Sequence, residues 1–136
     1  PDAVVCLMGN HERMMLDFLD KPLKAGPRWL RFGGSETLES YGIEPVKDDA
    51  DPEQLYAACE ELWDALPEGV EPWLRHLPLH WSSINLSCVH AALVPVHTIL
   101  QQSQEVMLWG CDTFMKTSRT DGNWVIHGHT VVDKPL

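Results

Sequence analysis

The sequence predicts an α/β fold in a single domain spanning residues 1–136. Short apolar runs indicate strands at 4–8 and 124–126, and a stretch with apolar residues between Ser and Asn is strand-like over 81–93. Segments with apolar residues at helical spacing separate the first two runs. The end of each strand-like run brings an Asn or a His, at Asn10, His90 and His127. With 44% hydrophobic residues, the chain has enough apolar surface for a core.

The first half of the chain predicts one strand followed by helices. The run 4–8 is a buried strand ended by Gly9, and a helix follows over 11–19. Residues 21–27, with two prolines, indicate a loop. Ser35 is expected to cap a helix that stops at Gly42, and 44–50 reads as a polar loop.

The next helix begins at Asp51-Pro52, a strong start signal, and Pro67 ends it. A short helix is expected over 71–77. Beyond the strand-like run 81–93, residues 94–102 fit a loop or a short helix, and 105–116 are ambiguous. Residues 121–123 indicate a turn before the strand 124–126, and residues 131–132 are expected to open one more strand.

Charge and composition exclude some classes of protein. Ten basic against twenty acidic residues give a net charge of −10, which opposes nucleic-acid binding because such proteins carry a basic face. The acidic residues concentrate over 44–71, as on a solvated face. The longest uncharged stretch, 77–104, is broken by polar residues and two prolines, so no membrane partner is expected. Four cysteines without a C-x-x-C pair favour a reduced, cytoplasmic protein.

Three motifs carry residues capable of chemistry. They are Gly9-Asn10-His11-Glu12, Val89-His90-Ala91 and His127-Gly128-His129-Thr130. Each has a structural alternative: a helix cap for the first, a buried core histidine for the second and a polar turn for the third. Taken together, Asn10, His90 and His129 form a nitrogen and oxygen ligand set suited to Mn²⁺, Fe or Zn²⁺.

These motifs, in this order, resemble the last three motifs of the calcineurin-like metallophosphoesterases. Within that superfamily they resemble the branch of bacterial serine/threonine protein phosphatases and diadenosine tetraphosphatases. The segments 26–34 and 37–42 resemble the stretch that follows the Asn-His motif in those enzymes. The resemblance covers nearly the whole chain and implies the C-terminal part of a β-sandwich flanked by helices.

The resemblance also implies residue roles and cofactors. Asn10, His90 and His129 would ligate the second of two divalent metal ions, expected to be Mn²⁺, with Fe and Zn²⁺ as alternatives. His11 would be catalytic, protonating the leaving oxygen or holding the phosphate. Glu12 and His127 would be supporting residues. The implied reaction is phosphate monoester hydrolysis, with a phosphorylated protein or a small phosphate ester as the partner.

The sequence departs from the family pattern at three places. The two earlier motifs, G-D-x-H-G and G-D-x-V-D-R-G, which would supply the first-metal ligands, are absent from this chain. Cys111 stands where the family has an Arg, for which Arg119 is a candidate substitute. Val131 replaces the usual Pro after G-H-T. Little hydrolysis is therefore expected from this chain alone, which reads as part of a longer protein or as a truncated relative.

Other functions remain open at this point. Symmetrical hydrolysis of diadenosine tetraphosphate uses the same motifs as protein dephosphorylation. A non-catalytic binding module that keeps the fold would fit Cys111 and the missing motifs. A structural zinc domain is disfavoured because short ligand pairs are lacking.

Overall fold

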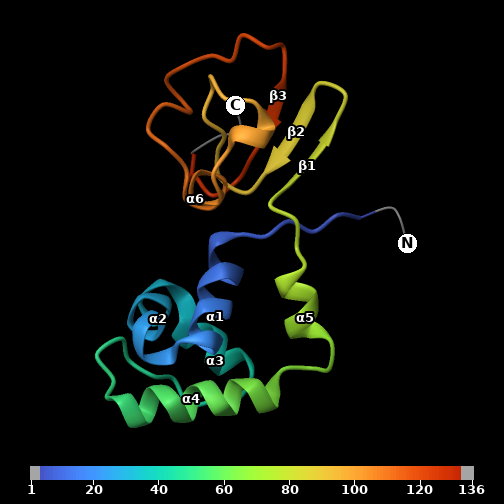
Figure 1. The fold of residues 1–136 in the computed structure, drawn as a ribbon. Coiled ribbons are helices and arrows are strands. Elements are labelled where there is room, and N and C mark those ends of the chain that lie inside the picture. Colours follow the sequence, from blue (N-terminus) through green and yellow to red (C-terminus); the bar gives the residue numbers. More distant parts are fainter. Residues whose placement is uncertain (1–3, 133–136) are drawn as a thin grey trace. The chain divides into compact units, whose positions relative to one another are not determined.

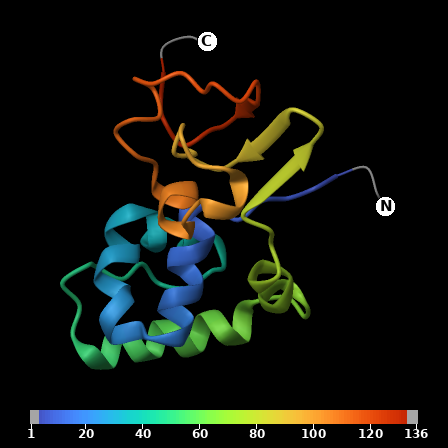
Figure 2. The ribbon, with the colours of Figure 1, turned by 45° about the horizontal axis from the view of Figure 1, so that its top comes forward.

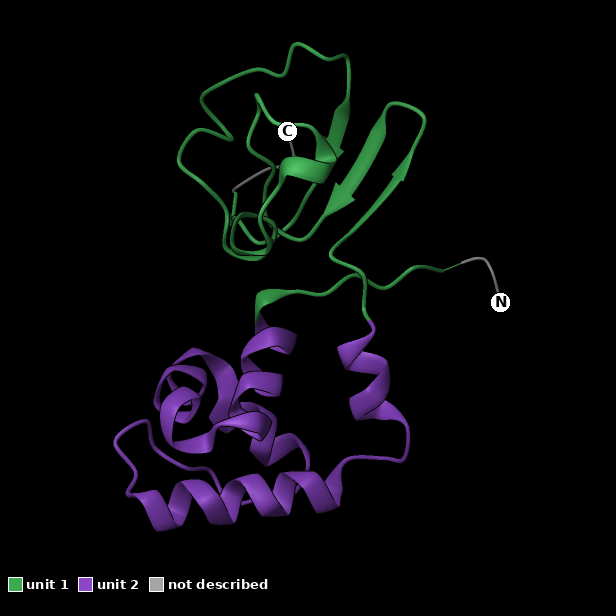
Figure 3. Ribbon diagram, in the orientation of Figure 1, with its two compact units in different colours: residues 1–10, 77–136 green, residues 11–76 purple. Residues whose placement is uncertain are grey.

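The computed structural model describes residues 4–132, in which the chain forms two compact units (Figure 3). Residues 11–76 form a helical unit, and residues up to Asn10 join those from Leu77 onward in a sheet unit. The expectation of a single domain stays a prediction. Figure 1 labels the elements, which are α1 (Asn10–Asp20), α2 (Pro22–Trp29), η1 (Leu30–Gly34), α3 (Ser35–Ser40), α4 (Pro52–Ala65), α5 (Val70–Arg75), β1 (His80–Ser83), β2 (Leu86–Val89), η2 (Ile99–Gln101), α6 (Gln104–Trp109) and β3 (Trp124–Ile126).

The helical unit is built around a stacked aromatic pair. Phe18 of α1 and Trp29 of α2 are both buried, with ring centroids 4.6 Å apart. Leu38 of α3 and Leu62 of α4 are also fully buried. In Figures 1 and 2, α1 and α2 lie side by side with α4 across them. The Cys59 thiol of α4 donates to the Phe18 carbonyl oxygen at 3.8 Å, and burial raises the pKa of this thiol.

The kink η1 allows the chain to turn tightly against Trp29. Gly33 has φ +96°, a left-handed conformation that glycine adopts without strain. Gly34 is buried, and a Cβ there would lie 2.6 Å from Cδ2 of Trp29 and 2.8 Å from its backbone carbon and oxygen. The close approach of Gly34 to Trp29 therefore requires a residue without a side chain.

Two expectations for this unit are wrong. The predicted loop 21–27 is largely helix α2, because Pro22 stands in the first turn, where a missing N–H loses no hydrogen bond. Ser35 is not a helix cap, since the backbone is already helical at Gly34. The Ser35 hydroxyl instead donates to the Val46 carbonyl oxygen and ties α3 to the loop over 43–50.

The remaining helix predictions are confirmed. Helix α1 matches the expected helix over 11–19, and α5 matches the one over 71–77. Asp51 caps α4 in a capping box with Gln54, and the helix ends just before Leu66. Residues 44–50 contain no helix or strand.

The sheet unit holds a mixed sheet in the order β1-β2-β3. Strands β1 and β2 form an antiparallel hairpin in which Trp81 pairs with Cys88, and β3 runs parallel to β2 with Cys88 opposite Ile126. One face of the sheet packs on a small core of Val89, Leu93 and Met107. The stretch 81–93 is thus two strands and a following loop rather than one strand.

Both ends of the described chain differ from expectation. Residues 4–8 form no strand, and Val4 and Val5 are exposed. A strand needs a neighbouring strand, and among the described residues none pairs with this segment, whose Met8 amide donates to the Pro78 carbonyl oxygen at 2.9 Å. Val131 and Val132 also lie in no strand, and any continuation falls outside the described residues.

These elements, helices with a small mixed sheet, belong to the general α/β class. Within residues 4–132, no helix combines the length and the apolar character needed to cross a bilayer.

Candidate metal centre

The site lies where β2 and β3 end. Because these strands are parallel, the residues that follow them emerge at the same edge of the sheet. His90 directly follows β2, and 127–129 directly follow β3. The Gly128 amide donates to the His90 carbonyl oxygen at 2.9 Å, which fixes one segment against the other. The strand-end pattern seen in the sequence therefore corresponds to a real convergence in space.

Asn10, His90 and His129 come together at this edge. Nε2 of His90 lies 2.7 Å from Oδ1 of Asn10 and 3.2 Å from Nδ1 of His129. Asn10 is only 4% exposed, whereas His90 is partly buried and His129 is exposed. With its proton on Nε2, His90 donates to the Asn10 amide oxygen. The site is thus open to solvent on the His129 side and closed on the Asn10 side.

The spacing of these three atoms fits ligands of one metal ion. Adjacent donors around an octahedral ion with bonds of about 2.1 Å lie about 3.0 Å apart, and tetrahedral donors lie somewhat further apart. The separations of 2.7 and 3.2 Å lie on either side of that value. Two imidazole nitrogens and an amide oxygen also suit Mn²⁺, Fe or Zn²⁺ chemically.

His129 occupies an unusual backbone conformation. Its φ is +62°, in the left-handed region that costs an ordinary residue about 1 kcal/mol or more. Its ring meets His90 edge-on, with centroids 5.0 Å apart, and meets Trp109 in the same way at 6.4 Å. Strained residues held by their surroundings often occur at functional sites, and His129 combines this conformation with a contact to His90.

A cleft of about 380 Å³ adjoins His129. It is lined by residues that follow β2, by the end of α6 and the loop after it, and by residues that follow β3, namely Ala91, Ala92, Trp109, Gly110, Cys111, Asp112, Phe114, Met115, His129 and Thr130. Two of its aromatic residues were not singled out from the sequence as site residues. They are Trp109 and Phe114, which lie in a stretch of the sequence without clear periodicity.

The other candidate residues have different surroundings. His127 is partly buried, donates from Nδ1 to its neighbour's carbonyl oxygen at 3.1 Å and meets the Phe114 ring edge-on at 4.7 Å. His11 and Glu12 belong to the helical unit, where a Cβ placed on Gly33 would lie 3.6 Å from Cε1 of His11. The structure thus brings Asn10, His90 and His129 together, with His127 next in sequence to the same turn.

The structure distinguishes Cys111, which stands where the resembled family has an arginine, from Arg119, the candidate substitute for that arginine. Cys111 lines the cleft, and its sulfur lies 3.5 Å from the Thr113 hydroxyl. The Arg119 guanidinium donates to the carbonyl oxygens of Val94 and His97 and forms an ion pair with Asp121. Arg119 therefore stabilises loops and is not among the residues that line the cleft.

Within residues 4–132, no cluster of three or more His, Cys, Asp or Glu side chains is placed to hold a metal ion. The trio contains two histidines and takes its third donor from an amide. No protein-family model, curated protein or solved structure matches this chain.

Proposed function

We propose that the chain contributes one metal site to the hydrolysis of phosphate monoesters, as a serine/threonine protein phosphatase of the metallophosphoesterase kind. The observation that carries the proposal is that His90 lies within hydrogen-bond distance of both Asn10 and His129, which are 80 and 39 positions away from it in the sequence. The same three residues occupy the ligand positions of the resembled motifs. A β-sandwich of that family is part of the proposal.

In this proposal Asn10, His90, His129 and His11 each have a separate role around a phosphate ester. A divalent cation held by the trio would act as a Lewis acid on a phosphate oxygen. Asn10, being buried, would fix the inner side of the site, and the exposed His129 would face the ester. His11 would carry the proton to the leaving oxygen. A second divalent ion, whose expected ligands this sequence lacks, would complete the proposed centre.

The cleft beside His129 favours a second candidate, hydrolysis of diadenosine tetraphosphate. Trp109 and Phe114 line this cleft and offer aromatic surfaces on which a nucleobase could stack. A phosphoserine side chain has no aromatic ring and gains nothing from these two residues. Comparing the two substrates therefore separates the two functions.

The test is hydrolysis of p-nitrophenyl phosphate, a phosphoserine peptide and diadenosine tetraphosphate with added Mn²⁺. It uses this chain and the longest polypeptide that contains it. His90→Ala and His129→Ala should abolish turnover and weaken Mn²⁺ binding, while His11→Ala should slow turnover and leave Mn²⁺ bound. His76→Ala, at an exposed position in the helical unit, is the control. Equal, measurable turnover in the wild type and in the His90 and His129 variants would refute the proposal, as would equal Mn²⁺ binding by all three proteins.

A further inference from the structure

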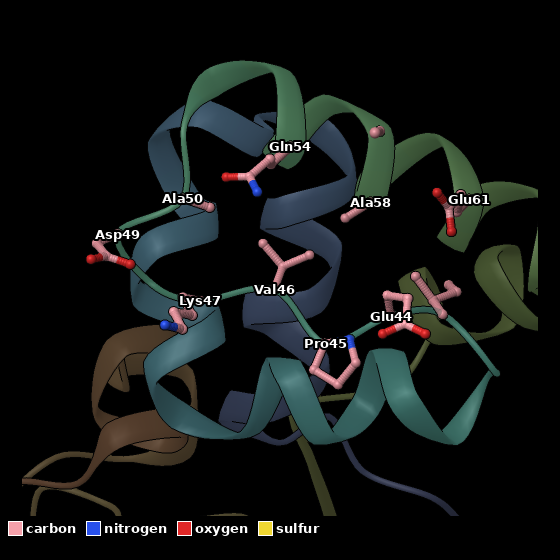
Figure 4. A pocket seen from close by; sticks show the side chains of 11 residues that line it. Glu44, Pro45, Val46, Lys47, Asp49, Ala50, Gln54, Ala58 and Glu61 are labelled. Carbon is pink, nitrogen blue, oxygen red and sulfur yellow. The ribbon is translucent and has the colours of Figure 1, made fainter.

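The helical unit contains a groove that the proposed chemistry does not use. It encloses about 460 Å³ between the loop 43–50 and helix α4. Figure 4 shows Val46 and Ala58 facing the space, with Glu44 and Glu61 at one end and Lys47 and Asp49 at the other. The volume falls in the range of pockets that take a ligand or a few side chains.

The floor of the groove is apolar and held in place. Ile43 and Ala58 line it and are both buried in the unit. The loop that forms one wall is fixed because the Ser35 hydroxyl donates to the Val46 carbonyl oxygen. The other wall is held by the Asp51–Gln54 capping box at the start of α4. The groove therefore has a preformed apolar surface on which an occupant's side chains can lie.

The charges along the rim are not neutralised by the protein itself. Glu44 and Glu61 are exposed, and within the described residues neither makes an ion pair. With Asp49 they give three carboxylates around the groove against the single cation of Lys47. An acidic or phosphorylated segment would be repelled by these carboxylates, whereas a basic one would be attracted.

We propose that this groove docks a short segment of a partner protein in which an arginine stands next to apolar residues. The guanidinium would lie between Glu44 and Glu61, where it can pair with carboxylates in its planar geometry. Its aliphatic stem and the neighbouring apolar side chains would cover Val46 and Ala58. This docking is independent of the metal centre, and it gives the chain a means of choosing protein partners.

The test is fluorescence polarisation of a fluorescein-labelled peptide in which two arginines alternate with leucine and valine. EDTA is present, so that the result does not depend on metal or on phosphatase activity. The control peptide carries citrulline, a neutral isostere, in place of each arginine. We expect the arginine peptide to bind, with an affinity that falls as salt is raised, and the citrulline peptide to bind at least about fivefold more weakly.

Matched variants locate the binding. Glu44→Gln and Glu61→Gln should each weaken binding about threefold, as expected for partly exposed charge pairs. Lys47→Gln should tighten it, because a repulsive charge is removed. Glu60→Gln, the neighbouring exposed residue of α4 that does not line the groove, should change nothing. Unchanged affinity in the Glu44→Gln/Glu61→Gln double variant, equal binding of the citrulline peptide or no binding up to about 1 mM would overturn the proposal.

Discussion

Gly34→Ala should destabilise the helical unit although the backbone at Gly34 suits alanine. Gly34 has φ −66° and ψ −38°, a right-handed helical conformation in which alanine gains about 1 kcal/mol over glycine. The added Cβ would meet Cδ2 of Trp29 at 2.6 Å and its backbone carbon and oxygen at 2.8 Å. Comfortable contacts between carbon atoms begin near about 3.5 Å, so the overlap approaches 1 Å.

The Trp29 ring cannot move away easily, because it is 1% exposed and stacked on Phe18. The backbone atoms of Trp29 cannot move without disturbing α2. Overpacking of this kind costs about 3 kcal/mol at its upper range, which leaves a net loss of about 2 kcal/mol after the gain in helix propensity.

Urea unfolding followed by circular dichroism at 222 nm measures this loss, since most helices belong to this unit. Gly42→Asn is the control. Gly42 has φ +77° with open space around it, and asparagine tolerates that conformation. A Gly34→Ala variant as stable as the wild type would refute the argument from close approach.

Three further changes test other parts of the account. Ile84 sits at φ 53° in the β1–β2 turn with its side chain fully exposed, so Ile84→Gly should relieve strain and stabilise the sheet unit by up to about 1 kcal/mol in thermal unfolding. The hydrogen bond from Arg75 holds the pKa of Asp20 below its ordinary 3.8. Stability from this pair is therefore present above that value and lost as the pH falls below it, and Asp20→Asn should flatten the acid limb of a stability profile. Leu62→Ala, at a fully buried position, should cost about 2–5 kcal/mol in urea unfolding, whereas a loss below 1 kcal/mol would mean that the site collapses around the gap.

The residues that could be predicted from the sequence are those whose signal is local. Asp51-Pro52 specifies a helix start by its own chemistry, and α4 begins there. The pairing of a strand with a following His also led to His90 and His129, because the parallel strands β2 and β3 deliver their ends to one edge, whereas Asn10 reaches the same place from the start of α1 without a strand before it. The convergence of the residues that follow β2 and β3 is thus predictable before the fold is known.

The predictions that failed depend on partners distant in the sequence. Residues 4–8 have strand composition, yet a strand exists only beside another strand, and none pairs with them among the described residues. The turn at Ile84-Asn85 lacks glycine, so the sequence predicts one strand-like stretch where the structure has the two strands β1 and β2. Trp109 and Phe114 lie in a stretch without clear periodicity, so only the fold shows that they line the cleft.

The central claim is that Asn10, His90 and His129 bind one divalent cation. Adding substoichiometric Mn²⁺ to isotope-labelled protein tests it directly, because the paramagnetic ion broadens the NMR signals of nearby nuclei. The account predicts that the ring signals of His90 and His129 and the Asn10 side-chain amide broaden first, and that His90→Ala abolishes this early broadening at His129 and Asn10. Equal broadening of all histidines, or none at His90 and His129, would contradict it.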